Sequence, residues 1–578
     1  MRPRTPLVPA SLLALAASCG LAAAQQAPNA PAPGAPKNPT EAVVPADPKP
    51  TPAPADPAGP AAKGVVFHDQ DGDGVRDEGE PGLPGVRVSN GRDVVRTDES
   101  GRYELPVDDD TILFVIKPRN WMTPVDAENL PKFYYIHKPA GSPETHFPGV
   151  APTGPLPASV DFPLVARDEP DAFKLLLFGD TQPRDVKEVE YITHDVIEPL
   201  IAAKSHGAVL GMTLGDVVFN DLSVFEPLKQ SVALLGLPWY NVLGNHDMNF
   251  DALDDRYSDE TWEHYFGPSY YSFDHGPVHF VVLDDVVWVH PGKDVKKPKG
   301  SYHGGLGARQ MEFLRNDLAS TPKDQLVVLT MHIPITEVEE RPEIFKLLAE
   351  RPHSLSLSAH LHQQQHRFLG PEDGFPADSP HHHLVHGTVC GSWWAGAPDE
   401  NGIPNATMSD GAPNGYSIVT FDGPKYDVEF HAARRPAGHQ MNIYAPEEVA
   451  AGAVATTDAV VNVFAGNEKS KVEIRLGDSG EWRPMARVSE ADPFYLDMKK
   501  LEEGPTPPPG RKLPAPHKST HLWRAPLGVG GDAPAAGTHL IQVRTTDMFG
   551  KTYVDGRAVR IVSGSEAPAD ARPAAAGN

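Results

Sequence analysis

The stretch NVLGNHDMNF, residues 241–250, begins like a buried strand and turns polar within a few residues. Val242 is apolar, and after a leucine and a glycine come an amide, an imidazole and a carboxylate, Asn245, His246 and Asp247. Such side chains bind metal ions and transfer protons. The stretch therefore predicts a functional site at the end of a strand.

Four other stretches have the same form, an apolar run that stops at potential metal ligands: FKLLLFGD (173–180), GAVLGMTLGD (207–216), DQLVVLTMH (324–332) and HSLSLSAHLH (353–362). Between them, apolar residues recur at helical spacing over 189–201 and 225–232. Alternating buried strands and amphipathic helices predict a layered α/β domain, in which polar groups gather at the carboxyl ends of the strands. We therefore expect the five polar ends to converge.

The candidate ligands offer oxygen and imidazole donors and no thiolate: Asp180, Gln182, Asp216, Asn245, His332, His360 and His362. This set suits divalent Mn, Fe or Zn, and one carboxylate can bridge two such ions. Each end alone is weak evidence, because a Gly-Asp pair is usually a turn and a lone histidine is usually a hydrogen-bonded core residue. Five in order are hard to explain by packing, since an unpaired buried polar group costs on the order of several kcal/mol.

The motifs D-x-Q, G-D, G-N-H-D, a single His and H-x-H, in this order, resemble the calcineurin-like metallophosphoesterases over about residues 172–432. The chain also has a predicted β module before this stretch and another after it, which are described below. In this it resembles the secreted bacterial branch of the family, which carries one β domain before the phosphoesterase domain and one after it. The resemblance implies a central four-layer α/β/β/α sandwich with a dinuclear metal centre, flanked by two all-β sandwich modules.

The resemblance also implies roles for these residues. One metal would be held by Asp180 and His362, both metals by the bridging Asp216, and the second metal by Asn245, His332 and His360. A metal-bridging hydroxide would attack phosphorus while His246, oriented by Asp247, protonates the leaving oxygen. Gln182 departs from the family's usual D-x-H, and an amide oxygen is a weaker ligand than imidazole.

The N-terminus has the form of a secretory signal peptide over residues 1–24, with Arg2 and Arg4 before a short apolar run and small residues before Gln25. That run is too short to span a bilayer. A lipoprotein site at Cys19 is the less favoured alternative. Residues 25–63 are a Pro/Ala-rich tether. These features predict an exported protein, periplasmic or extracellular, with Cys390 as the single cysteine of the mature chain.

Residues 64–166 alternate apolar and polar residues between turn signals, which predicts a β-sandwich. Within it, D-x-D-x-D-G-x5-E matches a twelve-position calcium loop whose ligands would be Asp69, Asp71, Asp73, the Val75 carbonyl, Asp77 and Glu80. The alternative is a solvated acidic turn. Because no helices flank the loop, we interpret it as a structural calcium site.

Residues 436–565 predict a second β-sandwich, interrupted by the Pro-rich insertion EEGPTPPPGRKLPAP, and 566–578 a disordered tail. Trp393 and Trp394 lie in a predicted loop that is either a substrate-contacting rim or an aromatic plug. Asn220 is a candidate substrate contact. The run His381–His383 is expected to be a solvated loop.

The formal net charge is −26, from 51 Lys and Arg against 77 Asp and Glu. This balance argues against non-specific nucleic-acid binding, which depends on basic side chains. The expected substrate is a phosphorylated small molecule, lipid or glycan. The alternative function is a non-catalytic cell-surface or glycan-binding protein with a decayed phosphoesterase core.

Overall fold

The computed structural model describes residues 60–203, 206–293, 300–478, 480–528 and 534–564, all within the unit 58–578. The predicted signal peptide, Cys19, nearly all of the 25–63 tether and the 566–578 tail lie outside the described residues. Across the described ranges, the helices are all too short or too polar to cross a bilayer.

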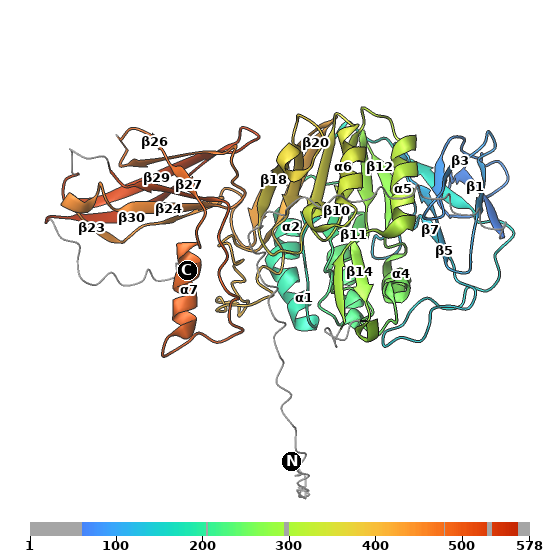
Figure 1. The fold of residues 1–578 in the computed structure, drawn as a ribbon, viewed down its shortest axis with the longest axis horizontal. Coiled ribbons are helices and arrows are strands. Elements are labelled where there is room, and N and C mark those ends of the chain that lie inside the picture. The colour runs from blue at the N-terminus through green and yellow to red at the C-terminus, as the bar shows by residue number, and fades with distance from the viewer. Residues whose placement is uncertain (1–59, 204–205, 294–299, 479, 529–533, 565–578) are drawn as a thin grey trace, which may run out of the picture. The chain divides into compact units, whose positions relative to one another are not determined.

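The first region contains two four-stranded sheets (Figure 1). One has the order β4-β1-β8-β6, with β1 Ala61–His68, β4 Arg102–Pro106, β6 Trp121–Met122 and β8 Phe162–Ala166. The other has the order β3-β2-β5-β7, with β2 Arg87–Ser89, β3 Val94–Arg96, β5 Thr111–Ile116 and β7 Tyr134–His137. Period-2 alternation is clearest in β4, where Tyr103 and Leu105 are buried between exposed residues.

The central region contains two larger sheets. The five-stranded sheet has the order β11-β10-β9-β20-β21, with β9 Ala172–Phe178, β10 Leu210–Leu214, β11 Trp239–Val242, β20 Gly415–Asp422 and β21 Lys425–Ala432. The six-stranded sheet has the order β12-β13-β16-β17-β19-β18, with β12 Tyr271–His275, β13 Val278–Val282, β16 Leu326–Thr330, β17 Ser354–Ser358, β18 Gln365–Leu369 and β19 His381–Val385. A two-stranded ribbon pairs β14 Val286–Val289 with β15 Ser301–Gly304.

The helices predicted between the strands are confirmed. The first comprises α1 Val186–Ile192, a π-helical turn Thr193–Ile197 and α2 Glu198–Ala203, and the second is α3 Phe225–Ala233. Leu176 and Phe178 of β9 belong to the apolar cluster that these helices form, whereas Leu175 and Leu177 belong to the cluster of the six-stranded sheet. Alternate residues of one strand therefore serve two cores.

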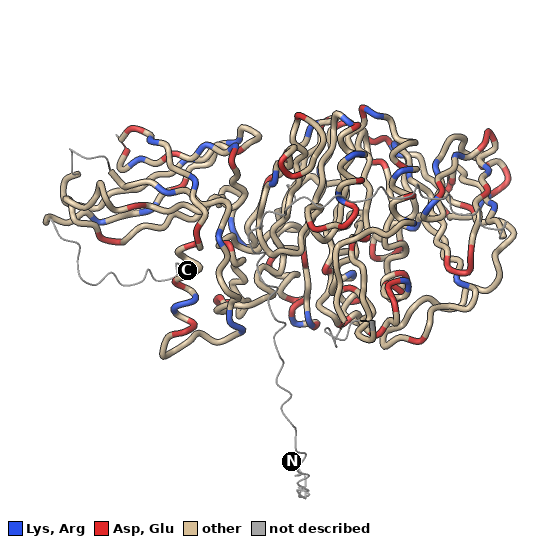
Figure 2. The backbone as a smooth tube through the Cα atoms, viewed as in Figure 1, with Lys and Arg blue, Asp and Glu red and all other residues tan. Residues whose placement is uncertain are grey.

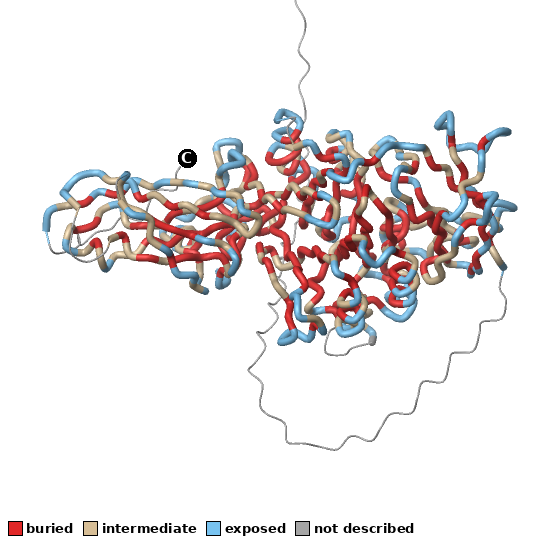
Figure 3. The backbone as a smooth tube through the Cα atoms, turned by 90° about the horizontal axis from the view of Figure 1, so that it is seen from above, coloured by how far each residue is buried: buried red, intermediate tan, exposed pale blue. Residues whose placement is uncertain are grey.

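Further helices belong to the central region: α4 Glu260–Phe266, α5 Gly307–Ser320 and α6 Arg341–Ala349. Apolar residues of α5 and α6, among them Phe313 and Phe345, lie in the same cluster as the six-stranded sheet. Figure 3 shows buried backbone concentrated along the central strands, with exposed residues at the loops.

The expectation of a solvated loop at His381–His383 is wrong, because these residues open the buried strand β19. His381 bonds to Ser354 (2.9 Å) and Ser356 (2.7 Å), and His383 bonds to Ser356 (2.7 Å) and Ser358 (3.0 Å). Alternating serines of β17 thus satisfy alternating imidazoles of β19. Buried polar groups are tolerated when they are hydrogen-bonded in this way.

The last region again has two sheets, ordered β22-β24-β28-β27 and β23-β30-β29-β25-β26. Their strands are β22 Met441–Tyr444, β23 Glu448–Ala450, β24 Asp458–Val463, β25 Lys471–Leu476, β26 Arg483–Pro484, β27 Ala486–Val488, β28 Leu522–Pro526, β29 Gly537–Thr546 and β30 Thr552–Val562. Helix α7, Pro493–Glu503, precedes the predicted Pro-rich insertion and ends on its first two residues, Glu502 and Glu503.

Candidate metal centre

Five strand ends bring the predicted ligands together. Strands β9, β10 and β11 are parallel neighbours in one sheet, and β16 and β17 are parallel neighbours in the other. Each is followed within four residues by a predicted ligand. Carboxyl ends of parallel strands lie at one sheet edge, so the ligands of each sheet form one group.

Asp216 contacts both sides of the cluster. Its Oδ2 accepts a hydrogen bond from Gln182 Nε2 at 2.8 Å, and its Oδ1 lies 3.3 Å from His332 Nε2. The same nitrogen of His332 is 3.1 Å from Asn245 Oδ1 and 3.1 Å from His360 Nδ1. The two oxygens of Asp216 therefore face different groups of predicted ligands, as a bridging carboxylate must.

Asp180 and His362 complete the cluster. His362 Nε2 lies 3.1 Å from Asp180 Oδ2, and the backbone N–H of His360 donates to Asp180 Oδ1 at 3.2 Å. All seven predicted ligands are thus joined by short contacts, and all except the partly exposed His360 are buried.

The backbone of the centre is strained. Five of the seven predicted ligands adopt positive φ values: Asp180, Gln182, Asp216, His360 and His362. Non-glycine residues seldom adopt this conformation, and such strain concentrates at functional sites. Glycine permits the close approach of the loops, because a Cβ on Gly244 would lie 2.0 Å from the Asp216 nitrogen. A Cβ on Gly215, whose φ is +83°, would lie 2.4 Å from His332 Nδ1.

Opposite charges pair inside the centre. Burial disfavours the charged imidazole of His332, but the carboxylates of Asp216 and Asp180 and the Leu214 carbonyl together raise the pKa of His332 to about 10. Likewise His332 lowers the pKa of Asp216 although burial opposes the shift. Burial and the neighbouring His332 lower the pKa of His360 to about 3. The centre therefore attracts positive charge toward its carboxylates.

The residues fit divalent cations. Asp180 Oδ2 is buried and receives no hydrogen bond, although His362 Nε2 lies close by. A buried carboxylate oxygen without a donor is costly, and an imidazole nitrogen beside it is a second ligand for the same ion. Ligand atoms of Asp216, His332 and His360 also lie within 4.8 Å of one another. As oriented, Gln182 presents its nitrogen to Asp216, and its amide must turn over to offer oxygen.

Three family models match the chain in order. The N-terminal model of calcineurin-like phosphoesterase matches residues 70–149, the calcineurin-like phosphoesterase model matches 173–364, and the C-terminal model matches 383–553. The chain belongs to the calcineurin-like phosphoesterases. It is accordingly a metal-dependent phosphoesterase, and the family implies divalent metal ions in this centre.

Two solved structures resemble this calcineurin-like phosphoesterase in part. A dimetal phosphatase from Danio rerio shares 12% identity, covering 45% of this chain and 99% of its own, with a TM-score of 0.30. A purple acid phosphatase from yellow lupin (Lupinus luteus) seeds shares 11% identity, covering 60% of this chain and 67% of its own, with a TM-score of 0.32. The curated proteins include no match. The family assignment rests on the three models.

His246 of this phosphoesterase is oriented by Asn220 and not by Asp247. Its Nδ1 lies 2.5 Å from Asn220 Oδ1, and its ring stacks on Phe219 at a centroid distance of 4.4 Å. Asp247 instead accepts three backbone hydrogen bonds, from Val217, Val218 and Gly244. The predicted His246–Asp247 pair is therefore wrong, because these buried amides use the carboxylate.

The pKa of His246 is also shifted in the direction opposite to our expectation. Burial lowers the pKa of His246, although the Asp216 carboxylate acts in the opposite sense. We expected Asp247 to favour the protonated ring, but its carboxylate accepts hydrogen bonds from three backbone amides and not from the imidazole. Asn220, expected to contact substrate, contacts the imidazole.

The two tryptophans have different environments. Trp394 is buried, its Nε1 donates to the Thr181 carbonyl at 3.4 Å, and it packs against Tyr191. Trp393 is partly exposed, and its ring packs against His362 in a tilted arrangement, with centroids 4.1 Å apart and an interplanar angle of 33°. From the sequence, the two tryptophans could form either a substrate-contacting rim or an aromatic plug. The burial of Trp394 fits a plug, and the partial exposure of Trp393 fits a rim.

Three further residues lie near the metal centre and were not predicted as part of it from the sequence. Cys390 Sγ lies 3.6 Å from Gln182 Oε1, and the Arg184 guanidinium lies over the Phe219 ring. Arg184 follows Gln182 by two residues, so the motif GDTQPR could have drawn attention to it. Arg511 reaches the same place from the C-terminal insertion, and no local signal indicates it.

The predicted calcium loop is closed by its own carboxylates. Asp69 is fully buried, and its two oxygens accept backbone hydrogen bonds from Gly72 and Gly74 at 2.7 and 3.0 Å. Glu80 accepts from Gln70 and Asp77 across the loop. Carboxylate oxygens of Asp69, Asp71 and Asp73 lie within 4.8 Å of one another.

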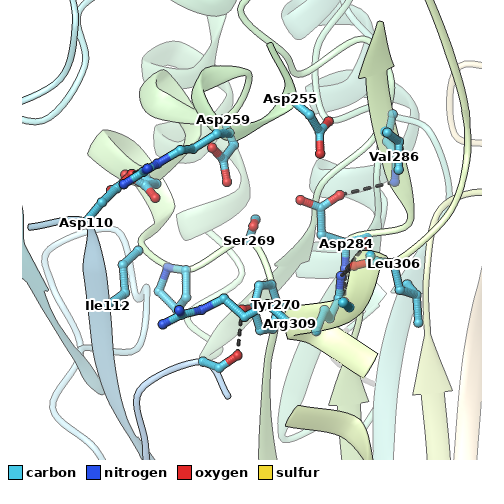
Figure 4. A pocket seen from close by; sticks show the side chains of 18 of the residues that line it. Asp110, Ile112, Asp255, Asp259, Ser269, Tyr270, Asp284, Val286, Leu306 and Arg309 are labelled. Carbon is cyan, nitrogen blue, oxygen red and sulfur yellow. Dashed lines mark hydrogen bonds and ion pairs between the residues drawn. The ribbon is translucent and has the colours of Figure 1, made fainter. Parts of the chain in front are cut away.

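A separate cavity of about 500 Å³ lies between strand β5 and the central region (Figure 4). The carboxylates of Asp255, Asp259 and Asp284 face it, together with Tyr270 and Arg309. Burial raises the pKa of Asp259 to about 7. None of the metal-centre residues lines this cavity.

Proposed function

We propose that the chain is an exported phosphoesterase that hydrolyses phosphate esters at a dinuclear metal centre. The observation that carries the proposal is the contiguous ligand cluster around Asp216, whose two carboxylate oxygens face Gln182 and His332 respectively. One cation would be held by Asp180, Gln182 and His362, and a second by Asn245, His332 and His360. Two divalent cations supply positive charge for phosphate oxygens and acidify water.

His246 is the proposed general acid. Its Nδ1 is occupied by Asn220, and its Nε2 has no hydrogen-bond partner among the described residues. The free nitrogen can therefore donate a proton to the leaving oxygen of a bound ester. An anionic substrate nearby favours the protonated imidazole, which opposes the effect of burial on its pKa.

Two structural proposals accompany this function. The loop 69–80 binds a structural calcium ion, since its carboxylates converge and its glycines take the positive φ that a tight loop needs. The domains extend over 64–166, 172–432 and 436–565, with the four-layer α/β/β/α order in the middle one and a β-sandwich on each side. The alternation of β9 between two apolar clusters supports this order.

The function is tested by supplying Mn, Fe and Zn separately to metal-free protein. A phosphomonoester panel and a phosphodiester panel should be hydrolysed with at least one of these metals and not without metal. His332→Ala is the matched negative control, because it removes one proposed metal ligand and changes no other charged side chain. Inactivity with all three metals on both panels would contradict the proposal and favour a non-catalytic role.

His246→Ala tests the acid role. Turnover of alkyl phosphates, whose leaving groups need a proton, should fall by about 100-fold or more, while turnover of nitrophenyl phosphate should change by less than about 5-fold. Steady-state kinetics on both substrates measure the difference. Equal losses on the two substrates would show that His246 does not protonate the leaving oxygen.

A further inference from the structure

Arg184 lies between the two sides of the metal centre. Its guanidinium carbon is 4.1 Å from the centroid of the Phe219 ring, which in turn stacks on His246. Its NH1 donates at 2.9 Å to the carbonyl of Trp393, whose ring packs against His362. Arg184 therefore neighbours the proposed acid on one side and a proposed metal ligand on the other.

Arg511 joins it from the C-terminal region. Its NH2 donates to the carbonyls of Trp393 and Trp394 at 3.2 and 3.3 Å, and it forms an ion pair with Glu188. Figure 2 shows Lys and Arg scattered along the described chain among many acidic residues. Two arginines that both donate to the carbonyl of Trp393, whose ring lies over the proposed ligand His362, are therefore a local concentration of positive charge in an acidic protein.

Packing of the insertion fixes Arg511. Tyr495 of α7 and Leu513 form a buried cluster with Ala395, which follows the two tryptophans. Glu502 accepts a hydrogen bond from the Leu513 nitrogen at 2.8 Å. The insertion that interrupts the C-terminal sheets thus contacts the turn that carries Trp393, and its Arg511 is held at the carbonyls of this turn.

The local charge does not cancel. Glu188, whose side chain is 4% exposed, lies 3.5 Å from Arg184 NH1 and also pairs with Arg511. One carboxylate neutralises one guanidinium, so one positive charge remains. Within the described part of the chain, the Nε and NH2 of Arg184 have no hydrogen-bond acceptor. These donors are therefore available to a ligand.

We propose that Arg184 binds a second phosphoryl group carried by the leaving group, so that the preferred substrate is a phosphoanhydride, a diphosphate, over a simple phosphate ester. This rests on the proposed function of the same site. Guanidinium matches phosphate oxygens in planar, two-pronged hydrogen bonds. Arg184 packs on Phe219, which stacks on His246, so it lies on the side of the proposed acid, where the leaving group must lie.

The reaction on such a substrate is hydrolysis of one phosphorus–oxygen bond. The oxygen of water forms a bond to the phosphorus at the metal centre, and the bond to the bridging oxygen breaks. The electron pair of that bond stays on the bridging oxygen, which leaves with the second phosphoryl group. One water proton remains on a phosphate product and the other goes to solvent. Arg184 neutralises the charge that develops on the leaving phosphate.

Arg184→Gln is tested with ethyl diphosphate and ethyl phosphate on the metal-loaded full chain. We expect kcat/KM to fall by about 10- to 100-fold on ethyl diphosphate, the size expected for one charge-assisted hydrogen bond, and by less than about 3-fold on ethyl phosphate. Lys512→Gln is the matched control, since it removes the same charge from an exposed neighbour of Arg511 and should change neither value.

Arg511 is a positioning residue, because it keeps Glu188 from neutralising Arg184. Arg511→Gln should lower kcat/KM on ethyl diphosphate selectively, and Arg511→Lys should retain most of it. Adding Glu188→Gln to Arg511→Gln should restore the preference for ethyl diphosphate, since the competing carboxylate is gone. A merely structural loss would not be rescued by this second change.

The outcomes separate this proposal from the proposed function. Activity of the wild-type protein on ethyl phosphate without a preference for ethyl diphosphate, or equal losses on both in Arg184→Gln, would overturn the subsite alone. Inactivity on both with every metal would overturn the function. Calorimetry then decides the subsite: tighter binding of pyrophosphate than of orthophosphate, lost in Arg184→Gln, supports it, and equal binding refutes it.

Discussion

Three clusters within the described residues bring three potential ligands within 4.8 Å of one another, and two of them differ in what balances their charge: Asp216, His332 and His360 in one, Asp110, Glu260 and Glu263 in the other. In the second cluster, Lys138 Nζ lies 2.9, 2.6 and 2.7 Å from the three carboxylates. In the first, no Lys or Arg of the described chain pairs with the Asp216 carboxylate. Converging carboxylates therefore predict a metal where the chain brings no Lys or Arg to them, because an imidazole can give up its proton and bind the metal instead.

The two clusters also differ in the atoms they direct inward. Imidazole nitrogens have lone pairs that bind metals when the ring is neutral, whereas the ammonium of Lys138 only donates. The lysine satisfies its carboxylates within the fold. The metal centre leaves Asp180 Oδ2 without a donor, which an external cation would correct.

The largest expected effect is that of Asp216→Asn. Because Asp216 faces both groups of ligands, the variant should lose metal from both positions and lower turnover by about 1000-fold or more. Elemental analysis of purified variant and wild-type protein measures the metal. Two retained equivalents would break the assignment of Asp216 as the bridging group.

Lys138→Met should convert the second cluster into one that lacks its cation. Leaving buried carboxylates unpaired is expected to lower the free energy of unfolding by about 3–5 kcal/mol, measured by urea denaturation. Lys63→Met is the control, since Lys63 pairs with Glu104 on the surface and should contribute less than about 1 kcal/mol. Calcium should stabilise Lys138→Met more than wild type, and equal stability of variant and wild type would refute the comparison.

The loop 69–80 is a third carboxylate cluster and, like the metal centre, has no lysine among its described contacts. Calcium at about 100 times its Kd should stabilise the fold by about 2.7 kcal/mol, and a chelator should remove the gain. Thermal unfolding with and without calcium measures the shift. Asp69→Asn should abolish it, and a calcium response that persists in this variant would place the ion elsewhere.

The smallest effect concerns the cavity of Figure 4. An unfolded aspartate titrates near 3.9, whereas burial raises the pKa of Asp259 to about 7 despite the attraction of Lys138. The stability due to this group is full below about pH 4 and is lost as pH rises toward 7.

Asp259→Asn removes that titration. Between pH 5 and pH 8, the free energy of unfolding of the variant should therefore fall less than that of wild type, with a difference on the order of 1 kcal/mol. Urea unfolding midpoints at the two pH values provide the measurement, with the exposed Asp422→Asn as control. Parallel curves for Asp259→Asn and wild type would show that Asp259 does not carry this dependence.

The strands and the ligand cluster could be predicted from the sequence because each apolar run stops at a polar side chain. That pattern predicts that the strand ends lie at a common edge. His332 contacts both Asp216 and Asn245 there. The helices over 186–203 and 225–233 followed from spacing alone.

Other features depend on partners distant along the chain. His381–His383 reads as a polar loop unless the serines of β17 are known to face it. Asp247 is adjacent to His246 in sequence, yet its carboxylate turns to the amides that follow β10. Arg511 lies more than 300 residues from Glu188, and only the packing of α7 brings them together.

Buried imidazoles in the six-stranded sheet and directly after it limit the acidity that this protein can tolerate. Burial lowers the pKa of His366 and His381 to about 3 and of His386 to about 4, so all three are neutral in the native core. An unfolded chain would take up protons at these rings below about pH 6.5. Acidification therefore favours the denatured state by mass action, and the interior of the molecule sets a lower bound on the pH of any surroundings in which it stays folded.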